Sequence, residues 1–319
     1  MEFREWFMKT NILKNTMQII RKGLGITADF VNIQNEIHET KMLTTRLLIN
    51  QMKSQGMHRN VQDVEFKVFA QFGDDGIIQY LVHHLKIESK TFIEFGVENY
   101  TESNTRFLLM NNNWKGLVID GSKENIDYIK NDNIYWNYDL TAVCAFVDRK
   151  NINKIFLENN FSGEIGLLSI DIDGNDYWVW EAIDAVNPVL VIIEYNSVFG
   201  DTDAITVPYD PKFVRTQAHY SNLYFGVSLK ALCFLAEKKG YAFVGSNSAG
   251  NNAYFVRTDK IGNLKQLSVR DGYVKSSFRE SRDPQGQLTH ISGDERMKII
   301  EGLSVYDVEK DAIVKISTL

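Results

Sequence analysis

Short apolar runs alternate with stretches of helical periodicity between residues 64 and 257. The runs are rich in β-branched and aromatic residues and fall at 91–97, 116–120, 134–138, 165–171, 189–194, 241–245 and 252–257. Helical stretches lie between most of them, at 76–86, 102–112, 123–131, 151–159, 176–185 and 227–239. Strands that alternate with helices predict a doubly wound α/β domain, in which helices cover both faces of a mostly parallel sheet.

Two connections depart from this alternation. The last two apolar runs are joined by a short Gly/Ser/Asn turn, which predicts a hairpin and an antiparallel pair at the end of the sheet. Residues 197–225 form a long connection rich in Tyr, Asp and Pro. Connections of this length in a compact domain are usually binding loops or lids, so we expect this one to cover the site.

The two ends of the chain differ from the alternating domain. Apolar residues recur at helical spacing from about Phe30 to Met52 and predict an amphipathic helix, which packs either on its own domain or on a second copy of the chain. A polar stretch at 53–63 predicts a linker. We therefore expect a helical extension with its linker over 1–63, the main domain over 64–257, and a C-terminal extension over 258–319 that is a candidate for substrate binding.

Composition narrows the class of protein. The 319 residues, 44% of them hydrophobic, are enough to bury a large core. A net charge of −6 without a Lys/Arg run argues against a surface for polymeric nucleic acid. Cys144 and Cys233 are too few for a disulfide framework or a zinc site and fit a reducing cytoplasm. We expect neither an export signal nor a membrane span, since the long apolar run that a span requires is missing from the sequence.

Acidic residues follow the first two predicted strands. Glu94 and Gly96 end the first, and Asp120 ends the second at the interval at which an acidic residue meets ribose hydroxyls in nucleotide-binding βαβ units. The turn lacks the further glycines of a dinucleotide fingerprint and is poorly shaped for a pyrophosphate. S-adenosylmethionine carries adenosine and a net positive charge but no phosphate, so it suits an acidic turn with one glycine. The alternative is that Glu94 and Asp120 only cap the helices that follow them.

A second acidic group ends two later strands. Asp171 and Asp173 close the run at 165–171, and Glu194 and Asn196 close the run that follows. The carboxyl ends of parallel strands meet at one edge of the sheet. Such oxygens suit two roles, which are to orient and deprotonate a substrate hydroxyl or, through Asp171, Glu194 and Asn196, to bind Mg²⁺. Asp176 is expected to cap the next helix.

Two further segments are expected near the site. Gln71 and Gly73 form a tight loop before the helix at 76–86, and we expect this loop to reach over the ligand. His219 lies beside Tyr220 in the long connection. Because histidine titrates near neutral pH, His219 is a candidate general base, and the alternative is an ordinary surface histidine.

The sequence resembles the FkbM-type group of class I S-adenosylmethionine-dependent methyltransferases over about residues 66–257. The segments that carry the resemblance are FIEFGVENYTESNT, GLVIDGS, LLSIDIDGNDYWVWEAI and VLVIIEYN. The flanking segments QFGDDGI, VPYDP and YFGVSLKAL resemble a methyltransferase-like branch of that group. One position departs from the group, because its usual KIDVEG section reads SIDIDG here, with Asp173 in place of Glu.

This resemblance implies a Rossmann-like sheet of seven strands with an antiparallel last strand, and O-methylation of sugars, polyketides or other small hydroxylated metabolites. It places Glu94 and Gly96 in the cofactor loop, Asp120 on the cofactor ribose, and Asp139 and Leu140 near adenine. The expected cofactor-binding residues are Gln71, Gly73, Glu94, Gly96, Asp120, Gly121, Ser122, Asp139, Leu140 and Asp171.

Together these features predict an S-adenosylmethionine-dependent O-methyltransferase, with Mg²⁺ as a second cofactor candidate. Its acceptor is expected to be small and polar, a nucleotide-linked sugar or a sugar of a polysaccharide pathway. The candidate catalytic residues are Asp171, Asp173, Glu194 and His219, and the candidate acceptor-binding residues are Asn196, Tyr220, Arg279 and Arg282. The two arginines suit a diphosphate. Two other classes stay open, an NAD-dependent oxidoreductase of Rossmann type and a non-catalytic cofactor-binding module.

Overall fold

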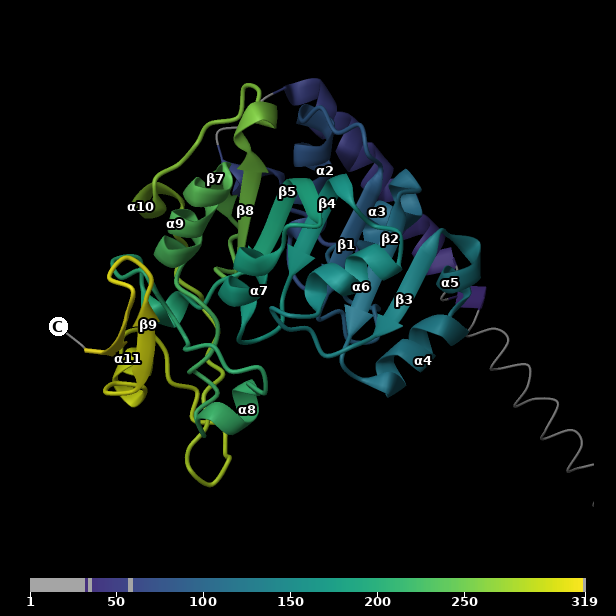
Figure 1. Ribbon diagram of the computed structural model, residues 1–319. Coiled ribbons are helices and arrows are strands. Elements are labelled where there is room, and N and C mark those ends of the chain that lie inside the picture. The colour runs from purple at the N-terminus through teal and green to yellow at the C-terminus, as the bar shows by residue number, and fades with distance from the viewer. Residues whose placement is uncertain (1–31, 34–35, 57–59, 318–319) are drawn as a thin grey trace, which may run out of the picture. The chain divides into compact units, whose positions relative to one another are not determined.

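A seven-stranded sheet in the order β3-β2-β1-β4-β5-β8-β7 organises the computed structural model, which describes residues 32–33, 36–56 and 60–317 (Figure 1). The strands are β1 Thr91–Phe95, β2 Lys115–Asp120, β3 Leu140–Cys144, β4 Gly163–Ile170, β5 Val186–Glu194, β7 Tyr241–Ser246 and β8 Asn252–Arg257. Strands β1 to β5 pair in parallel, whereas β8 is antiparallel to both of its neighbours, β5 and β7. The predicted Rossmann-like sheet with an antiparallel last strand is therefore confirmed.

Helices cover both faces of this sheet. Figure 1 shows α6, α7 and α9 on the face toward the viewer and α2 and α3 on the other. The helices that follow or precede these strands are α2 Asp74–His84, α3 Arg106–Asn112, α4 Lys123–Asn131, α5 Asn133–Asn137, α6 Ile152–Glu158, α7 Asp176–Ala182 and α9 Leu229–Lys239. Side-chain caps fix several of their ends. Ser122 and Ser228 accept hydrogen bonds from the first turns of α4 and α9, and Gly240 ends α9 in the left-handed conformation.

One predicted strand, 134–138, is wrong. These residues belong mainly to the short helix α5, where the Asp132 side chain accepts a hydrogen bond from the N–H of Ile134 and so caps the helix. Of the apolar residues that suggested a strand, Ile134 is buried but Trp136 is 74% exposed. Strand β3 begins only at Leu140, so Asp139 precedes the third strand and Leu140 is its first residue, and neither follows it. Leu140 pairs with Gly116 at the amino end of β2, whereas Cys144 pairs with Asp120.

The central strands are buried on both faces, which explains their uninterrupted apolar sequences. Residues 189–193 of β5 have no measurable exposure, and they join a core that includes Trp180, Leu232 and Phe255 from the neighbouring elements. Full burial of each such side chain stabilises the folded state by about 1.5–3 kcal/mol relative to leaving that side chain exposed. The sheet is therefore a rigid base for the loops at its carboxyl edge.

Two acidic residues at the start of α2 tie this helix to the rest of the domain. Gly73 is the N-cap of this helix. Asp74 accepts hydrogen bonds from Asn252 Nδ2 at 3.0 Å and from the Tyr254 hydroxyl at 2.5 Å. Oδ2 of Asp75 accepts three backbone N–H groups, those of residues 68–70, at 2.7–2.8 Å. These carboxylates fix the loop that carries Gln71.

The long connection and the C-terminal part of the chain fold together. Strand β6 (Ile205–Thr206) of the connection pairs with β9 (Ser304–Asp307), which pairs with β10 (Ala312–Lys315) in a three-stranded sheet. The Tyr224 hydroxyl donates to the carbonyl of Ser304. The remaining short elements are η1 Val61–Val64, η2 Ser197–Phe199, α8 Arg215–Ala218, η3 Thr258–Lys260, α10 Val269–Gly272 and α11 Glu295–Ile299. We call residues 197–225 the lid.

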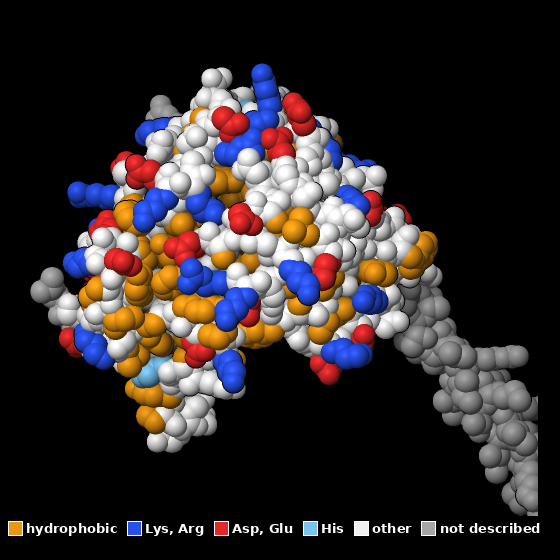
Figure 2. Space-filling model, in the orientation of Figure 1, with side chains coloured by type: hydrophobic (Ala, Val, Ile, Leu, Met, Phe, Trp, Pro, Cys, Tyr) orange, Lys and Arg blue, Asp and Glu red, His pale blue; other side chains and the backbone are white. Residues whose placement is uncertain are grey.

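The chain divides into one unit of residues 1–51 and another of residues 52–319. Residues 36–55 are helical, as predicted for the N-terminal extension, whereas the start of that predicted helix at Phe30 and residues 57–59 of the predicted linker lie outside the described residues. Within the described ranges, none of the helices is both long enough and apolar enough to cross a lipid bilayer. On the face shown in Figure 2, acidic and basic side chains are interspersed.

Candidate active site

A cavity of about 620 Å³ lies along the carboxyl ends of the parallel strands, the edge at which open α/β sheets bind ligands. The turns after β1, β2, β3 and β4 and the end of β5 all contribute to its wall. The residues they contribute include Glu94, Gly96, Asp120, Gly121, Ala145, Phe146, Val147, Asp171, Ile172, Asp173 and Glu194.

Gly96 brings the turn after β1 into contact with the end of β4. Its φ of +77° lies in the left-handed region, and a Cβ on this residue would stand 1.5 Å from the carbonyl oxygen of Asp171. Only glycine fits this position. The two turns therefore form one continuous wall of the cavity.

Glu94 is buried beneath the β1 turn and holds the loop that follows it. Its carboxylate accepts hydrogen bonds from Ser103 Oγ at 2.5 Å, from the N–H of Asn104 at 3.0 Å and from both the N–H and the hydroxyl of Thr105. Burial raises the pKa of Glu94 against the opposing effect of these donors. The carboxylate thus shapes the loop before α3 while it lines the cavity. Its partners are residues 103–105, which precede the first residue of α3, so it orders this loop rather than capping the helix itself.

Asp120 joins the turn after β2 to the turn after β1. Its carboxylate accepts hydrogen bonds from the N–H groups of Glu98 and Ser122, each at 2.8 Å, and from Asn125 Nδ2 at 3.1 Å. Two of these bonds go to Oδ1 and one to Oδ2. A carboxylate oxygen can accept at least two, so Oδ2 retains capacity for a ligand hydroxyl in the cavity.

Three carboxylates meet where β4 and β5 end. One oxygen from each of Asp171, Asp173 and Glu194 lies within 4.8 Å of the others. Burial, and then the charges of the neighbouring carboxylates, raises the pKa of both Asp171 and Glu194 well above the ordinary range. Carboxyl groups in this state are typical of general bases and of sites for hard cations.

Asp176 stabilises the turn after β4, which carries Asp171 and Asp173. Its carboxylate accepts hydrogen bonds from the N–H groups of Ile172 and Gly174, each at 2.9 Å. The predicted cap is therefore wrong, because Asp176 is the first residue of α7 and binds the turn before the helix, whereas Asn175 is the N-cap. The lid packs closely on the same turn, because a Cβ on Gly174 would stand 2.2 Å from the ring of Phe213. Asn175 Nδ2 donates to the carbonyl of Asp210 at 2.7 Å.

Arg215 of the lid reaches the carboxylate cluster, although it is not among the site residues predicted from the sequence. Its Nη1 donates to Asp173 Oδ1 at 2.6 Å, its Nε donates to the carbonyl of Asn222 at 3.0 Å, and its guanidinium lies 3.7 Å from the centre of the Phe225 ring. Burial opposes its charge, but Asp173 and Glu194 raise the pKa of Arg215. A cation in the long connection, opposite an acidic strand end, is the sequence signal that could have identified it.

Asn196 stabilises the lid through hydrogen bonds to its backbone. Its Nδ2 donates to the carbonyls of Leu223 at 2.9 Å and Phe225 at 3.0 Å, and its Oδ1 accepts from the N–H of Val198 at 3.0 Å. Both amide protons are used within the protein, so this side chain has no N–H left for an acceptor although it lines the smaller cavity. Its Oδ1, which would be the metal ligand, already accepts one hydrogen bond. Asp173 takes its place beside Asp171 and Glu194.

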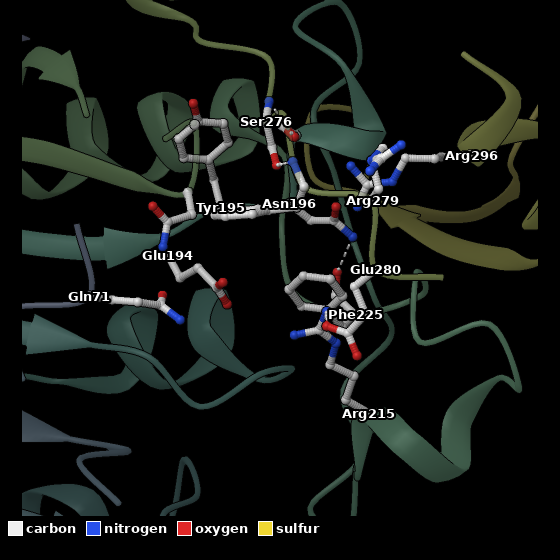
Figure 3. Close-up of a pocket in the computed structure, with 14 residues that line it drawn as sticks. Gln71, Glu194, Tyr195, Asn196, Arg215, Phe225, Ser276, Arg279, Glu280 and Arg296 are labelled. Carbon is white, nitrogen blue, oxygen red and sulfur yellow. Dashed lines mark hydrogen bonds and ion pairs between the residues drawn. The ribbon is translucent and has the colours of Figure 1, made fainter. Parts of the chain in front are cut away.

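A second cavity, of about 220 Å³, adjoins the first. Gln71, Glu194, Arg215, Asn251 and Glu280 line both cavities. Figure 3 shows Gln71 and Glu194 on one side of the smaller cavity and Arg279 and Arg296 on the other. The C-terminal part of the chain therefore builds one wall of the site, and Glu194 stands where the two cavities meet.

The remaining predicted residues divide by position. Gln71 and Gly121 line the larger cavity and Arg279 lines the smaller one. His219 is not brought into the site, because it lines neither cavity and its Nδ1 lies 2.7 Å from Ser221 Oγ. Its role as the general base is therefore withdrawn. The predicted residues that likewise line neither cavity are Gly73, Ser122, Asp139, Leu140, Tyr220 and Arg282.

No family model matches this chain, and no curated protein matches it in sequence. It is similar in fold to the N-terminal domain of EvdMO1 with SAH bound, at 11% identity over 66% of this chain and 94% of that one, with a TM-score of 0.37. An S-adenosylmethionine-dependent methyltransferase from Clostridium acetobutylicum ATCC 824 is 10% identical over 57% of this chain and 89% of its own, with a TM-score of 0.37. TrmK of M. capricolum in complex with S-adenosylhomocysteine is 12% identical over 60% of this chain and 72% of its own, with a TM-score of 0.33. Likeness at this level carries no conclusion about function, which follows from the cavities instead.

Proposed function

We propose that this chain is an S-adenosylmethionine-dependent methyltransferase. The observation that carries the proposal is the acidic wall of the larger cavity at the carboxyl edge of the sheet. The acidic residues on that wall are Glu94, Glu98, Glu102, Asp120, Asp171, Asp173, Glu194 and Glu280, and Arg215 is the cation among them. Such a wall repels a pyrophosphate and attracts a ligand with net positive charge, such as S-adenosylmethionine.

The shape of the cavity supports a definite orientation of this ligand. Asp120 Oδ2 is the acceptor for a ribose hydroxyl, as an acidic residue after the second strand is in other nucleotide-binding folds. Phe146, which follows β3 and is 55% exposed, offers an aromatic face for adenine and replaces Asp139 and Leu140 in that role. The positively charged end then lies toward Asp171 and Glu194.

We assign the catalytic base to Glu194. It is half-buried, burial and the charges of nearby carboxylates raise its pKa, and it lines both cavities. When bound, S-adenosylmethionine supplies a methyl group on a sulfonium, which is an activated leaving group. Because the leaving group is already activated, the protein needs only to align the acceptor hydroxyl and to take its proton on Glu194.

A metal-assisted arrangement is the second mechanism that the cluster supports. The oxygens of Asp171, Asp173 and Glu194 are the donors that Mg²⁺ prefers, and a bound Mg²⁺ would lower the pKa of the acceptor hydroxyl. Against it, Asp173 is already paired with Arg215. If methyl transfer continues in EDTA, the mechanism with Glu194 as the base and no metal is supported. If EDTA abolishes methyl transfer and added Mg²⁺ restores it, the metal-assisted mechanism is supported.

Replacement of Glu194 by Gln tests the assignment of the base. We expect methyl transfer to fall by about 10²- to 10⁴-fold, the usual contribution of a general base, while S-adenosylhomocysteine still binds. Glu309→Gln, on an exposed carboxylate outside both cavities, is the matched control. Full activity of Glu194→Gln would remove Glu194 from the mechanism.

The acceptor that we propose is a small hydroxylated molecule, a sugar in nucleotide-linked form or within a polysaccharide pathway, and the reaction is O-methylation. The support is the resemblance to the FkbM-type group and the polar lining of the smaller cavity, which includes Ser276 and Asn251. A panel of sugar nucleotides, free sugars and sugar phosphates, assayed for methyl transfer, tests this class of acceptor. Tight cofactor binding without transfer to any of them would favour a non-catalytic binding module.

We also propose that the N-terminal helix joins two copies of the chain. Ile33 and Ile37, and likewise Leu43 and Leu47, are exposed and spaced four residues apart. Exposed apolar residues at this spacing suit the same helix of a second copy. Removal of residues 1–51 is expected to convert a dimer to a monomer by light scattering without loss of cofactor affinity. An unchanged stoichiometry contradicts the dimer.

A further inference from the structure

Arg296 is a buried cation for which the described part of the chain supplies no hydrogen-bonded or ion-paired side-chain partner. It belongs to α11, it is only 7% exposed, and it lines the smaller cavity. Its Nε is buried without a hydrogen-bond partner, and the side chain forms no ion pair with any residue in the described part of the chain. Burial, followed by the charge of Arg215, lowers the pKa of Arg296. A buried charge that stays unpaired is strongly destabilising, so an anionic ligand is the partner that this position lacks.

Arg279 adds a second guanidinium to the same wall. It is exposed, it lines the smaller cavity, and in Figure 3 its end points toward the part of the cavity that Arg296 reaches. Arginine presents parallel N–H donors that match two oxygens of one oxyanion. Two guanidinium groups on one wall therefore favour a phosphoryl group, with its two negative charges, over a single carboxylate.

The charges of the smaller cavity are separated along its length. Glu194 lies on the side that opens into the larger cavity, opposite Arg279 and Arg296 (Figure 3). Glu280, the other acid on this wall, is within ion-pair distance of Arg215 at 3.8 Å and Arg282 at 3.9 Å. Its charge also raises the pKa of Arg296, but within the described residues it forms no ion pair with Arg296, and burial still lowers that pKa. A ligand that fits this pattern has an uncharged polar end and an anionic end.

We propose that the smaller cavity binds a phosphoryl group through Arg296 and Arg279, and that the acceptor is a phosphorylated compound whose hydroxyl faces Glu194. The statement about the hydroxyl rests on the proposed function, whereas the phosphate site does not. The assignment also replaces Arg282, which lines neither cavity, with Arg296.

Thermal unfolding of the full chain in inorganic phosphate, compared with chloride at the same pH and ionic strength, tests the site without a known acceptor. We expect phosphate to raise the Tm of the wild type. The variant Arg296→Met should lose this increase, and Lys298→Met should keep it, because Lys298 is an exposed cation on the same helix and outside both cavities. Equal increases in all three proteins, or none in the wild type, would overturn the proposal.

Two further measurements distinguish the loss of the phosphate site from misfolding of the variants. Without phosphate, Arg296→Met should unfold at the same temperature as the wild type or higher, since it removes an unpaired buried charge. Arg279→Ala, at an exposed position, should keep the Tm of the wild type and weaken phosphate binding by about tenfold or more. Normal phosphate binding by Arg279→Ala contradicts the two-arginine site.

A comparison of the affinities of four ligands identifies which kind of compound carries the phosphoryl group that binds here. Inorganic phosphate, pyrophosphate, a hexose 1-phosphate and a nucleoside-diphosphate hexose are each titrated into wild type and Arg296→Met. Tighter binding of the nucleotide-linked hexose than of the hexose phosphate identifies a nucleotide-linked acceptor, and the reverse order identifies a simple sugar phosphate. Preference for an uncharged hexose over all of them contradicts the site.

Failure of this inference and failure of the proposed function give different results. Binding of S-adenosylhomocysteine together with a missing phosphate effect refutes the anion site alone. A phosphate effect that depends on Arg296, in a protein that does not bind S-adenosylhomocysteine, supports the anion site and refutes the methyltransferase.

Discussion

At the scale of single residues, Gly96 sets the shape of the larger cavity. Gly96→Ala introduces a Cβ 1.5 Å from the carbonyl oxygen of Asp171, in addition to the cost of about 1–2 kcal/mol for a left-handed alanine. We expect a lower Tm and loss of S-adenosylhomocysteine binding. Gly163→Ala is the matched control, because its φ is also positive but nothing lies within 4 Å of the added Cβ. Similar behaviour of the two variants would mean that the close approach to Asp171 is absent in solution.

Asp75 makes stability depend on pH. Burial raises its pKa from 3.8 to about 7, although three backbone N–H groups oppose this effect. The folded state therefore binds more protons than the unfolded state between about pH 4 and pH 7, so this group makes the free energy of unfolding fall as the pH rises through that range. Asp75→Asn cannot ionise. Denaturation at several pH values should show the variant gaining stability relative to the wild type toward pH 7, and a constant difference contradicts the raised pKa.

The acidic strand ends were visible in the sequence because each follows an apolar run, and the structure brings Glu94, Asp120, Asp171 and Glu194 to one cavity. Arg215 and Arg296 were not visible in this way. Whether a polar side chain in a connection faces inward depends on tertiary packing, and local periodicity does not encode it. His219 was chosen for its intrinsic chemistry, and it lies outside both cavities for the same reason.

At the scale of elements, the lid is held to the β4 turn by Arg215. Arg215→Ala removes the ion pair with Asp173 and the hydrogen bond to Asn222, so we expect a loss of about 1–3 kcal/mol in the free energy of unfolding and faster proteolysis within residues 197–225. Lys154→Ala, which breaks a more exposed pair with Glu158 on α6, should change proteolysis of the lid little. Equal proteolysis of the two variants contradicts a lid fastened by Arg215.

Most elements followed from the hydrophobic pattern, because buried parallel strands are continuously apolar and the helices between them are capped by local signals such as Ser122 and Ser228. The segment at 134–138 was predicted wrongly because a stretch of only five residues shows no distinct period, and the cap at Asp132 stabilises a helix there. Strand β6 has only two residues and exists through its pairing with β9, about a hundred residues later in the chain.

At the scale of the whole molecule, the lid and the C-terminal chain share one apolar cluster. Phe199, Ile205 and Leu223 of the lid pack with Ile300 and Val305 of the C-terminal part. Ile300→Ala, at a fully buried position, should lower the free energy of unfolding by about 2–5 kcal/mol. Ile313→Ala, at a residue 56% exposed in β10, should change it by less than about 0.5 kcal/mol. Chemical denaturation that finds the two variants equal contradicts the shared cluster.

Calorimetric titration of the protein with S-adenosylhomocysteine and, separately, with NAD decides between the proposed methyltransferase and an oxidoreductase of the same fold. We predict that S-adenosylhomocysteine binds one to one and that NAD does not bind. Asp120→Asn, which keeps the size of the side chain but loses its charge, should bind S-adenosylhomocysteine about tenfold more weakly or worse, because Oδ2 would otherwise accept a ribose hydroxyl. Binding of NAD without binding of S-adenosylhomocysteine, or an unchanged affinity in Asp120→Asn, would contradict the account.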